Sequence, residues 1–306
     1  MEYSIFKPIE KITEYAHRIY EGRYENNDEL IQYADPSKNP KEISKLAETF
    51  SLMALKLEAR EIHLENQLEV VKEKNIQLES EMIKREHFGF IFIVFTIFLT
   101  IYTFSVAYVS KLPIELIPYK AQINTVVNIG FSLLLVSIAI LLIKRTKISL
   151  REFGLNLTNW RKSISETMVV TLILLVLLSL VKIWMLATYK PFQGKSFFEF
   201  SNIDWTFLIY AVVAPVQEFI ARGVFQSSVN RFILVENQAF WSITLTALIF
   251  GLVHTYYSIE LSVLAMITSY IWGYLYFRVP TLLGISLSHF ILGNFLMLID
   301  LWQFFV

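Results

Sequence analysis

The sequence contains no cysteine, and this absence removes several kinds of chemistry. Without a thiol the chain forms no disulfide, has no thiolate nucleophile and offers no cysteine ligand to zinc. It also lacks an excess of one charge, because 27 Lys and Arg residues balance 27 Asp and Glu residues. With no net charge and no basic tract, the composition predicts no nucleic-acid partner.

Hydropathy divides the chain into a polar part, residues 1–87, and an apolar part, residues 88–306. The first ten residues are mixed polar and do not predict a signal peptide. The apolar part consists of seven segments, each near the ~20 residues that a helix needs to cross a bilayer. They are Phe88–Val109, Ala121–Ile143, Thr167–Tyr189, Trp205–Phe225, Ala239–Tyr257, Leu261–Phe277 and Thr281–Val306. The pattern predicts an all-α polytopic membrane helix bundle with about seven spans in a lipid bilayer.

The distribution of Lys and Arg between the loops predicts how these spans are oriented. The loop that joins the second and third segments is the richest. It contains Lys144, Arg145, Lys147, Arg151, Arg161 and Lys162. We therefore expect a multi-pass protein of the cell inner (plasma) membrane, with a cytoplasmic N-terminus and Val306 outside. Lys182 lies near one end of its segment, where a lysine can extend its amino group to the interface.

The polar N-terminal part has a helical periodicity of its own. Apolar residues recur at alternating spacings of four and three from Ile5 to Ile19, and Gly22 ends this run. After a polar stretch, a heptad pattern extends from Ile43 to Met82, with Glu61 breaking one position. A polar residue in such a seam, here Asn75, commonly fixes the register of a coiled coil. The seam needs a partner, and a second copy is the simplest one, so we expect a homodimer through these helices.

Residues 1–60 resemble a HAMP domain, a parallel homodimeric four-helix module that passes conformational signals along a helix. The matching features are Pro8-Ile9, Gly22-Arg23-Tyr24, and Glu42-Ile43 followed by Leu46, Phe50, Met53 and Leu57. The resemblance implies a HAMP-like two-helix module at 1–60, a coiled-coil signalling helix at 43–87 and a membrane domain at 88–306. A plain two-helix coiled coil that serves only dimerisation is the alternative.

Polar side chains are scattered inside the hydrophobic C-terminal half. They are Gln217, Glu218 and Arg222 in one segment, His254 in the next, and His289 with Asn294 in the last. Ionisable groups are costly in hydrocarbon and usually face a shared, functional interior. Glu218 and Arg222 are four residues apart, so they share a helix face and can pair. Counted from the cytoplasmic border, the polar groups lie roughly 16–24 Å deep at 1.5 Å per residue, which predicts one intramembrane site.

These residues carry a resemblance. Residues 204–300 resemble the CAAX protease and bacteriocin-processing (CPBP) family of intramembrane proteases, which has a Glu-Glu-x-x-x-Arg helix, a Phe-x-x-x-His helix and a His-x-x-x-Asn helix. The corresponding segments here are Gln217-Glu218-Phe219-Ile220-Ala221-Arg222 followed by Gly223, Phe250-Gly251-Leu252-Val253-His254, and His289-Phe290-Ile291-Leu292-Gly293-Asn294. The loop Leu150–Leu155 also resembles the short Gly-Leu element that often precedes the core of the family.

The resemblance implies an intramembrane endopeptidase acting on a peptide or membrane-protein substrate. In the family, the first Glu and the first His activate water. His289 and Asn294 would stabilise the oxyanion, and Arg222 would keep a neighbouring carboxylate ionised. Zinc ligation by Glu218, His254 and His289 is an alternative, which ranks lower because the His-x-x-x-His pair of a zincin helix is absent.

Two departures from the family pattern bear on activity. The first Glu is replaced by Gln217, and an amide has no basic lone pair to act as the general base. The third motif has one extra residue, which places Asn294 about 140° around a regular helix from His289. A distortion of the helix, made easier by Gly293, would be needed for the two side chains to share a face.

Three interpretations follow from these departures. The chain is an active glutamate/histidine protease, with regulation by the N-terminal dimerisation region. Alternatively, it is a catalytically inactive relative that binds a membrane partner and relays a signal. The third interpretation is that Gln217 is an engineered Glu→Gln change in an active enzyme.

Overall fold

The computed structural model describes residues 3–24, 27–111, 119–255 and 257–305. Within these ranges every regular element is a helix. The chain forms two compact units, Met1–Glu81 and Met82–Val306. The all-α fold class predicted from hydropathy is confirmed. Val306, which was predicted to lie outside the cell, falls beyond the described residues.

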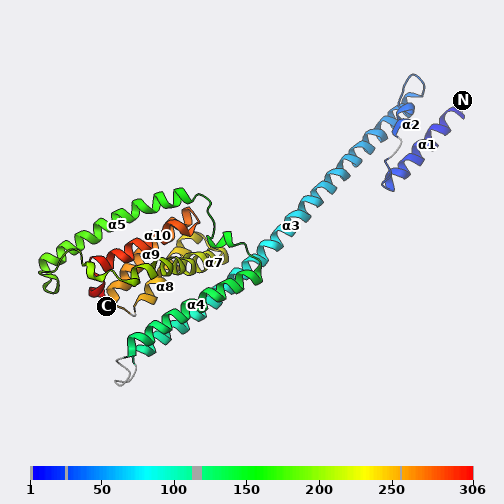
Figure 1. The fold of residues 1–306 in the computed structure, drawn as a ribbon. Coiled ribbons are helices and arrows are strands. Elements are labelled where there is room, and N and C mark those ends of the chain that lie inside the picture. Colours follow the sequence, from blue (N-terminus) through cyan, green and yellow to red (C-terminus); the bar gives the residue numbers. More distant parts are fainter. Residues whose placement is uncertain (1–2, 25–26, 112–118, 256, 306) are drawn as a thin grey trace. The chain divides into compact units, whose positions relative to one another are not determined.

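The first unit contains helix α1 (Tyr3–Tyr20), helix α2 (Asn27–Tyr33) and the first part of the 70-residue helix α3 (Lys41–Ser110) (Figure 1). Its core consists of Ile12, Tyr15, Ile19, Leu30, Ile43, Ala47 and Ala54. Gly22 adopts a left-handed φ of 76° just after α1, as C-terminal capping of a helix requires. The predicted end of the first helical run at Gly22 is thus confirmed, whereas the HAMP-like module remains a prediction.

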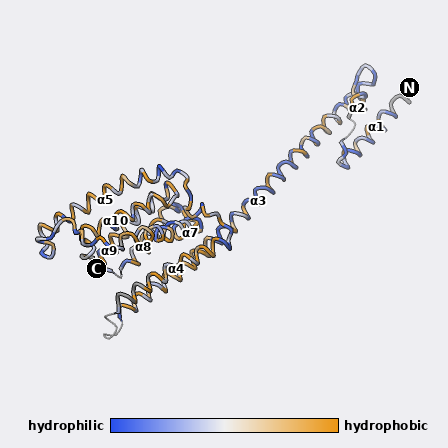
Figure 2. The backbone as a smooth tube through the Cα atoms, viewed as in Figure 1, coloured by the Kyte–Doolittle hydropathy of each residue, from blue (hydrophilic) through white to orange (hydrophobic). Residues whose placement is uncertain are grey.

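In the second unit each of the seven predicted apolar segments contains a helix. These helices are the second part of α3, α4 (Lys120–Thr146), α5 (Trp160–Thr188), α6 (Trp205–Glu218) with its continuation, α8 (Gln238–His254), α9 (Ile259–Arg278) and α10 (Leu282–Leu298). Five of the described helices are long and apolar enough to cross a membrane, and two, α8 and α10, are shorter apolar helices. Figure 2 shows the hydrophobic character of this unit. The protein is a multi-pass membrane helix bundle.

Helix packing in this unit gathers the polar motifs toward the centre. Helix α10 packs against both α5 and α6, and α8 packs along α9 (Figure 1). The hydrophobic core that surrounds them includes Phe95 of α3, Val224, and Ile285 of α10, each at most 1% exposed. Because α6, α8 and α10 carry the three sequence motifs, this packing brings the motifs to one part of the bundle.

The Gly-Leu element forms a short 3-10 helix, η2 (Leu150–Phe153), which ends at Gly154 with φ 74°. The side chain of Phe153 is fully buried. Its carbonyl oxygen lies so close to Gly223 that a Cβ atom there would be only 2.7 Å from it, too close for a non-bonded contact. Gly223 therefore allows η2 to dock against the first motif.

Lys182, expected to extend its amino group to the membrane interface, is covered by protein. The side chain is fully buried, with its Nζ 4.3 Å from the centre of the Phe192 ring and without a hydrogen-bond partner. Phe192 belongs to the short 3-10 helix η3 (Lys190–Phe192), which follows α5 directly. The chain after α5 thus encloses the lysine, and the sequence position of a lysine alone does not predict such a cover.

Candidate active site

The first motif spans a change of helix type. Helix α6 ends at Glu218, and Phe219–Gln226 form a π-helix, η5, which continues into α7 (Ser227–Phe232). In a π-helix each backbone hydrogen bond joins residues five positions apart, instead of four as in an α-helix. The directions of successive side chains around the axis therefore differ from those of an α-helix. Such segments are frequent at functional sites. Here the π-helix begins directly after Glu218 and contains Arg222.

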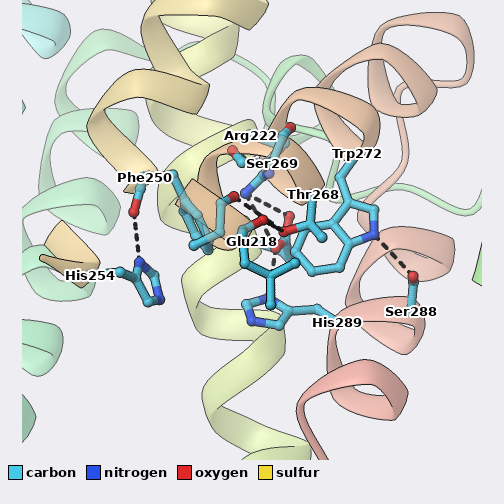
Figure 3. Close-up of polar contacts among 11 residues, drawn as sticks. Glu218, Arg222, Phe250, His254, Thr268, Ser269, Trp272, Ser288 and His289 are labelled. Atoms are coloured by element: carbon cyan, nitrogen blue, oxygen red, sulfur yellow. Dashed lines mark hydrogen bonds and ion pairs between the residues drawn. The ribbon is translucent and has the colours of Figure 1, made fainter. Parts of the chain in front are cut away.

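Glu218 lies at the centre of a fully buried polar cluster (Figure 3). Its Oε1 accepts hydrogen bonds from Nδ1 of His289 at 2.7 Å and from Nη1 of Arg222 at 3.2 Å. Its Oε2 lies 3.1 Å from the same Arg222 nitrogen. The predicted pairing of Glu218 with Arg222 is present, and His289 from α10 completes the cluster. A buried carboxylate is tolerated because it is paired and hydrogen-bonded.

The guanidinium of Arg222 is held by helix α9. Nη2 donates to the carbonyl oxygen of Ser269 at 3.0 Å and to its hydroxyl at 2.7 Å. The guanidinium also lies over the rings of Phe250 and Trp272, 4.8 and 5.6 Å from their centroids, where cation–π attraction adds to the ion pair. Arg222 is therefore fixed in the orientation that faces Glu218.

The imidazole of His289 is also held in place by residues outside the Glu218–Arg222–His289 cluster. It stacks on Trp272, with ring centroids 4.7 Å apart and an angle of 30° between the planes. The indole nitrogen of Trp272 donates to the hydroxyl of Ser288 at 2.9 Å, and Thr171 of α5 donates to that hydroxyl at 2.7 Å. With Nδ1 bound to Glu218, the ring has its Nε2 left for other contacts.

Gln217 and His254 lie on a second surface, a pocket of about 110 Å³. The pocket is lined by side chains of α3, α4, α6, η5 and α8, most of them apolar. Oε1 of Gln217 is buried and accepts no hydrogen bond. Neither Glu218 nor His289 lines this pocket. Position 217, where the family has its first Glu, thus faces the same space as His254.

The imidazole of His254 is oriented by its own helix. Nδ1 donates to the carbonyl oxygen of Phe250, one turn earlier, at 2.6 Å (Figure 3). In the neutral ring this hydrogen bond leaves Nε2 without a proton, so Nε2 is a hydrogen-bond acceptor and a base. The geometry suits His254 to take a proton from water in the pocket.

Phe250 separates the two halves of the site. Its ring centroid lies 4.7 Å from that of His254 and 5.8 Å from that of His289. Among the described residues, no hydrogen bond joins His254 to Glu218 or to His289. The motif residues are therefore neighbours, arranged as a buried Glu218–Arg222–His289 cluster and a pocket with Gln217 and His254.

Asn294 does not join His289 on one helix face. Helix α10 is a regular α-helix from Leu282 to Leu298, so the extra residue in the motif is not absorbed by a bulge. The Asn294 amide donates a long hydrogen bond of 3.5 Å to the carbonyl oxygen of Phe207, and its Oδ1 has no partner. Gly293, expected to ease a distortion, instead packs against the ring of Tyr210. Helix α6 approaches α10 closely at this point.

The three motifs, with Glu218, Arg222, His254 and His289 arranged as described, can now be compared with known proteins. Residues 200–295 match the family model described as type II CAAX prenyl endopeptidase Rce1-like. This segment is a CPBP domain. No curated protein matches the chain, and no solved structure matches it either.

The arrangement of the CPBP domain does not fit a metal ion. Among the described residues, no three His, Cys, Asp or Glu side chains are grouped so that they could hold a metal. Glu218 and His289 contact each other, but His254 lies beyond Phe250 and faces the pocket. The zinc site considered from the sequence is therefore not formed by these three residues.

Several residues that support the CPBP site were not predicted from the sequence. They are Ser269 and Trp272 of α9, Ser288 of α10, and Thr171 of α5. One signal was present in α9, where Ala265, Ser269 and Gly273 recur every four residues. Such a row of small residues is typical of a close helix–helix contact in membranes, and within it Ser269 and Gly273 accept hydrogen bonds from Arg222 and Gln226 of η5.

Proposed function

We propose that this chain is an intramembrane endopeptidase of the CPBP type, embedded in the cell inner membrane with a cytoplasmic N-terminus. The observation that carries the proposal is the shared pocket of Gln217 and His254. It lies beside the Glu218–Arg222–His289 cluster, and both Gln217 and His254 belong to the segment that matches the CAAX prenyl endopeptidase family. The mostly apolar lining suits a peptide substrate with an apolar segment.

In the proposed reaction, water in the pocket attacks the carbonyl carbon of the scissile peptide bond. Its proton passes to Nε2 of His254, assisted by a carboxylate at position 217 where one is present. His289 in its doubly protonated form stabilises the oxyanion of the tetrahedral intermediate, donating from Nε2–H while Nδ1–H stays bound to Glu218. The C–N bond then breaks, and the proton moves from His254 to the leaving amine. Glu218 and Arg222 hold His289 in place.

Asn294 contributes less to this proposal than the family resemblance implies. On a regular α10 it points away from the face of His289. We assign the oxyanion contact to His289 and keep Asn294 as a residue that links α10 to α6.

The replacement of the carboxylate by Gln217 predicts a slow enzyme. Loss of a general base typically costs ~10²–10⁴-fold in rate. Gln217→Glu should therefore raise cleavage of a fluorogenic membrane peptide by about this factor. Gln217→Met, similar in size but without a carboxylate, is the matched control and should give no rise. His254→Ala in the Gln217→Glu chain should abolish the gain.

A second candidate function is favoured by Gln217 itself. As an inactive relative, the protein would bind a membrane partner in the pocket and relay a signal from the N-terminal dimerisation region. Absence of cleavage in both the unmodified and the Gln217→Glu chain would favour this function. Cleavage by the unmodified chain that depends on Glu218 would instead make Glu218 the base.

A further inference from the structure

The heptad seam of α3 is covered in its first part and bare in its second. Ile43, Ala47 and Ala54 are at most 6% exposed, because they face the core of the first unit. The same seam continues along the helix at alternating four-residue and three-residue steps. Its later members, Leu64, Leu68, Val71 and Leu78, are each between 54% and 60% exposed. A row of exposed leucine and valine at this spacing is typical of a coiled-coil contact.

The cover ends after Ala54, because the next seam residue, Leu57, is 39% exposed and is followed by Glu61 at a seam position. Tyr24, just after the end of α1, donates a hydrogen bond to Glu61, and this bond is the main cause that raises the pKa of Tyr24. Glu61 is thus engaged within its own chain. Beyond it, the seam residues of α3 have the exposures given above, and the helix is continuous through them.

We propose that residues 61–78 of α3 pair with the same residues of a second copy as a parallel, in-register, two-stranded coiled coil. The heptad assigns Leu64, Val71 and Leu78 to position d and Leu68 to position a. Asn75 also falls at position a, where a buried asparagine favours two strands in one register. Eighteen residues of helix give a contact of roughly 27 Å.

The charges beside the seam fit this orientation. In a parallel pair, position g of one helix approaches position e of the next heptad in the other. Arg60 then meets Glu65 of the partner subunit, and Lys74 meets Glu79 of the partner subunit. Because the proposed dimer is two-fold symmetric, each of these pairs occurs twice. The remaining pair, Gln67 with Lys72 of the partner subunit, has no like-charge conflict. None of the four ionic side chains forms an ion pair within its own chain in the described ranges.

The native chain has no cysteine, so single cysteines test the contact in the full-length protein. Leu64→Cys and Leu78→Cys lie at equal distances on either side of Val71. In a parallel, in-register pair each crosslinks to its own copy in membranes under mild oxidation. We expect both to do so, with yields roughly fivefold above those of Asn66→Cys and Ser80→Cys, which point outward, because a disulfide requires close Cβ atoms. Ile76→Cys, apolar and exposed but off the seam, controls for non-specific association.

Other outcomes overturn the proposal. Crosslinking of Leu64→Cys with Leu78→Cys in a mixture, without crosslinking of either alone, would indicate antiparallel helices. Equal yields at Ser80 or Ile76 would indicate contact without a seam. Absence of crosslinks at all positions would leave the seam to a different partner.

A charge exchange tests the orientation without altering the seam. In the Leu78→Cys chain, Lys74→Glu should lower the crosslinking yield roughly threefold by placing like charges together. Adding Glu79→Lys restores an attractive pair and should restore the yield. A loss that Glu79→Lys fails to reverse would contradict the assigned pairing. These measurements do not depend on peptidase activity.

Discussion

Nδ1 of His289 and Oε1 of Glu218 are joined by a 2.7 Å hydrogen bond across 71 residues of sequence. The bond places two motif residues in one buried cluster whose third member is Arg222. Arg222→Met should lower the free energy of unfolding by about 3–5 kcal/mol, because it leaves the buried carboxylate without its cation. Unfolding of the protein in detergent, followed by circular dichroism, measures this loss.

The control for this prediction removes the charge on both sides. Glu218→Gln with Arg222→Met should lose less stability than Arg222→Met alone, since no unpaired charge remains. If the stability loss of the double variant equalled the sum of the losses of Glu218→Gln alone and Arg222→Met alone, the ion pair would not be the reason for the effect.

The contact between Gly293 and Tyr210 gives a second prediction. A Cβ atom on Gly293 would lie 2.1 Å from Cε1 of Tyr210, so Gly293→Ala should cost about 1–3 kcal/mol through overpacking. Tyr210→Leu in the same chain should recover part of the loss. Gly130→Ala is the matched control, because nothing lies within 4 Å of its Cβ position, and it should be neutral or stabilising. An equal loss at both glycines would contradict the steric explanation.

A third prediction concerns pH and the turn before α3. The carboxylate of Asp35 accepts hydrogen bonds from the hydroxyl of Ser37 at 2.6 Å and from its N–H at 2.9 Å. These bonds, with Lys38 nearby, lower the pKa of Asp35 below its ordinary value of 3.8. Because the pKa is lowered in the folded state, the stabilisation is present above pH 3.8 and is lost as the pH falls through the folded value.

Hydrogen exchange of the Ser37 amide measures this effect. Its protection factor should fall on acidification below about pH 4, and Asp35→Ala should be weakly protected at every pH. Protection of the unmodified chain that stayed constant down to pH 2 or so would contradict the role of the carboxylate.

Sequence patterns predicted the positions of the helices more completely than the residues that pack over them. Each apolar segment contains a helix, because hydropathy and length act locally on the chain. The burial of Lys182 was not predicted, because Phe192, from the following turn, lies over its amino group. That contact depends on how the chain folds back after α5, which local hydropathy does not specify.

The site was predictable only where it depends on spacing along a single helix. The pairing of Glu218 with Arg222 follows from their spacing on one helix, and the separation of His289 from Asn294 follows from helical rotation. The bond from His289 to Glu218, and the placement of His254 beyond Phe250, depend on packing between helices. The π-helix has no local signal that we identified, although Pro215 lies shortly before it in α6.

Two sets of hydrogen bonds, four residues apart along each helix, connect the π-helix with α9. Arg222 binds Ser269, and Gln226 donates to the carbonyl oxygen of Gly273 at 2.9 Å. Sliding either helix along its axis by one turn would break both sets of hydrogen bonds together. It would leave buried polar groups unpaired, and each unpaired group costs about 1–3 kcal/mol. Sliding of one helix relative to the other is therefore resisted, and a force on either helix moves the two together.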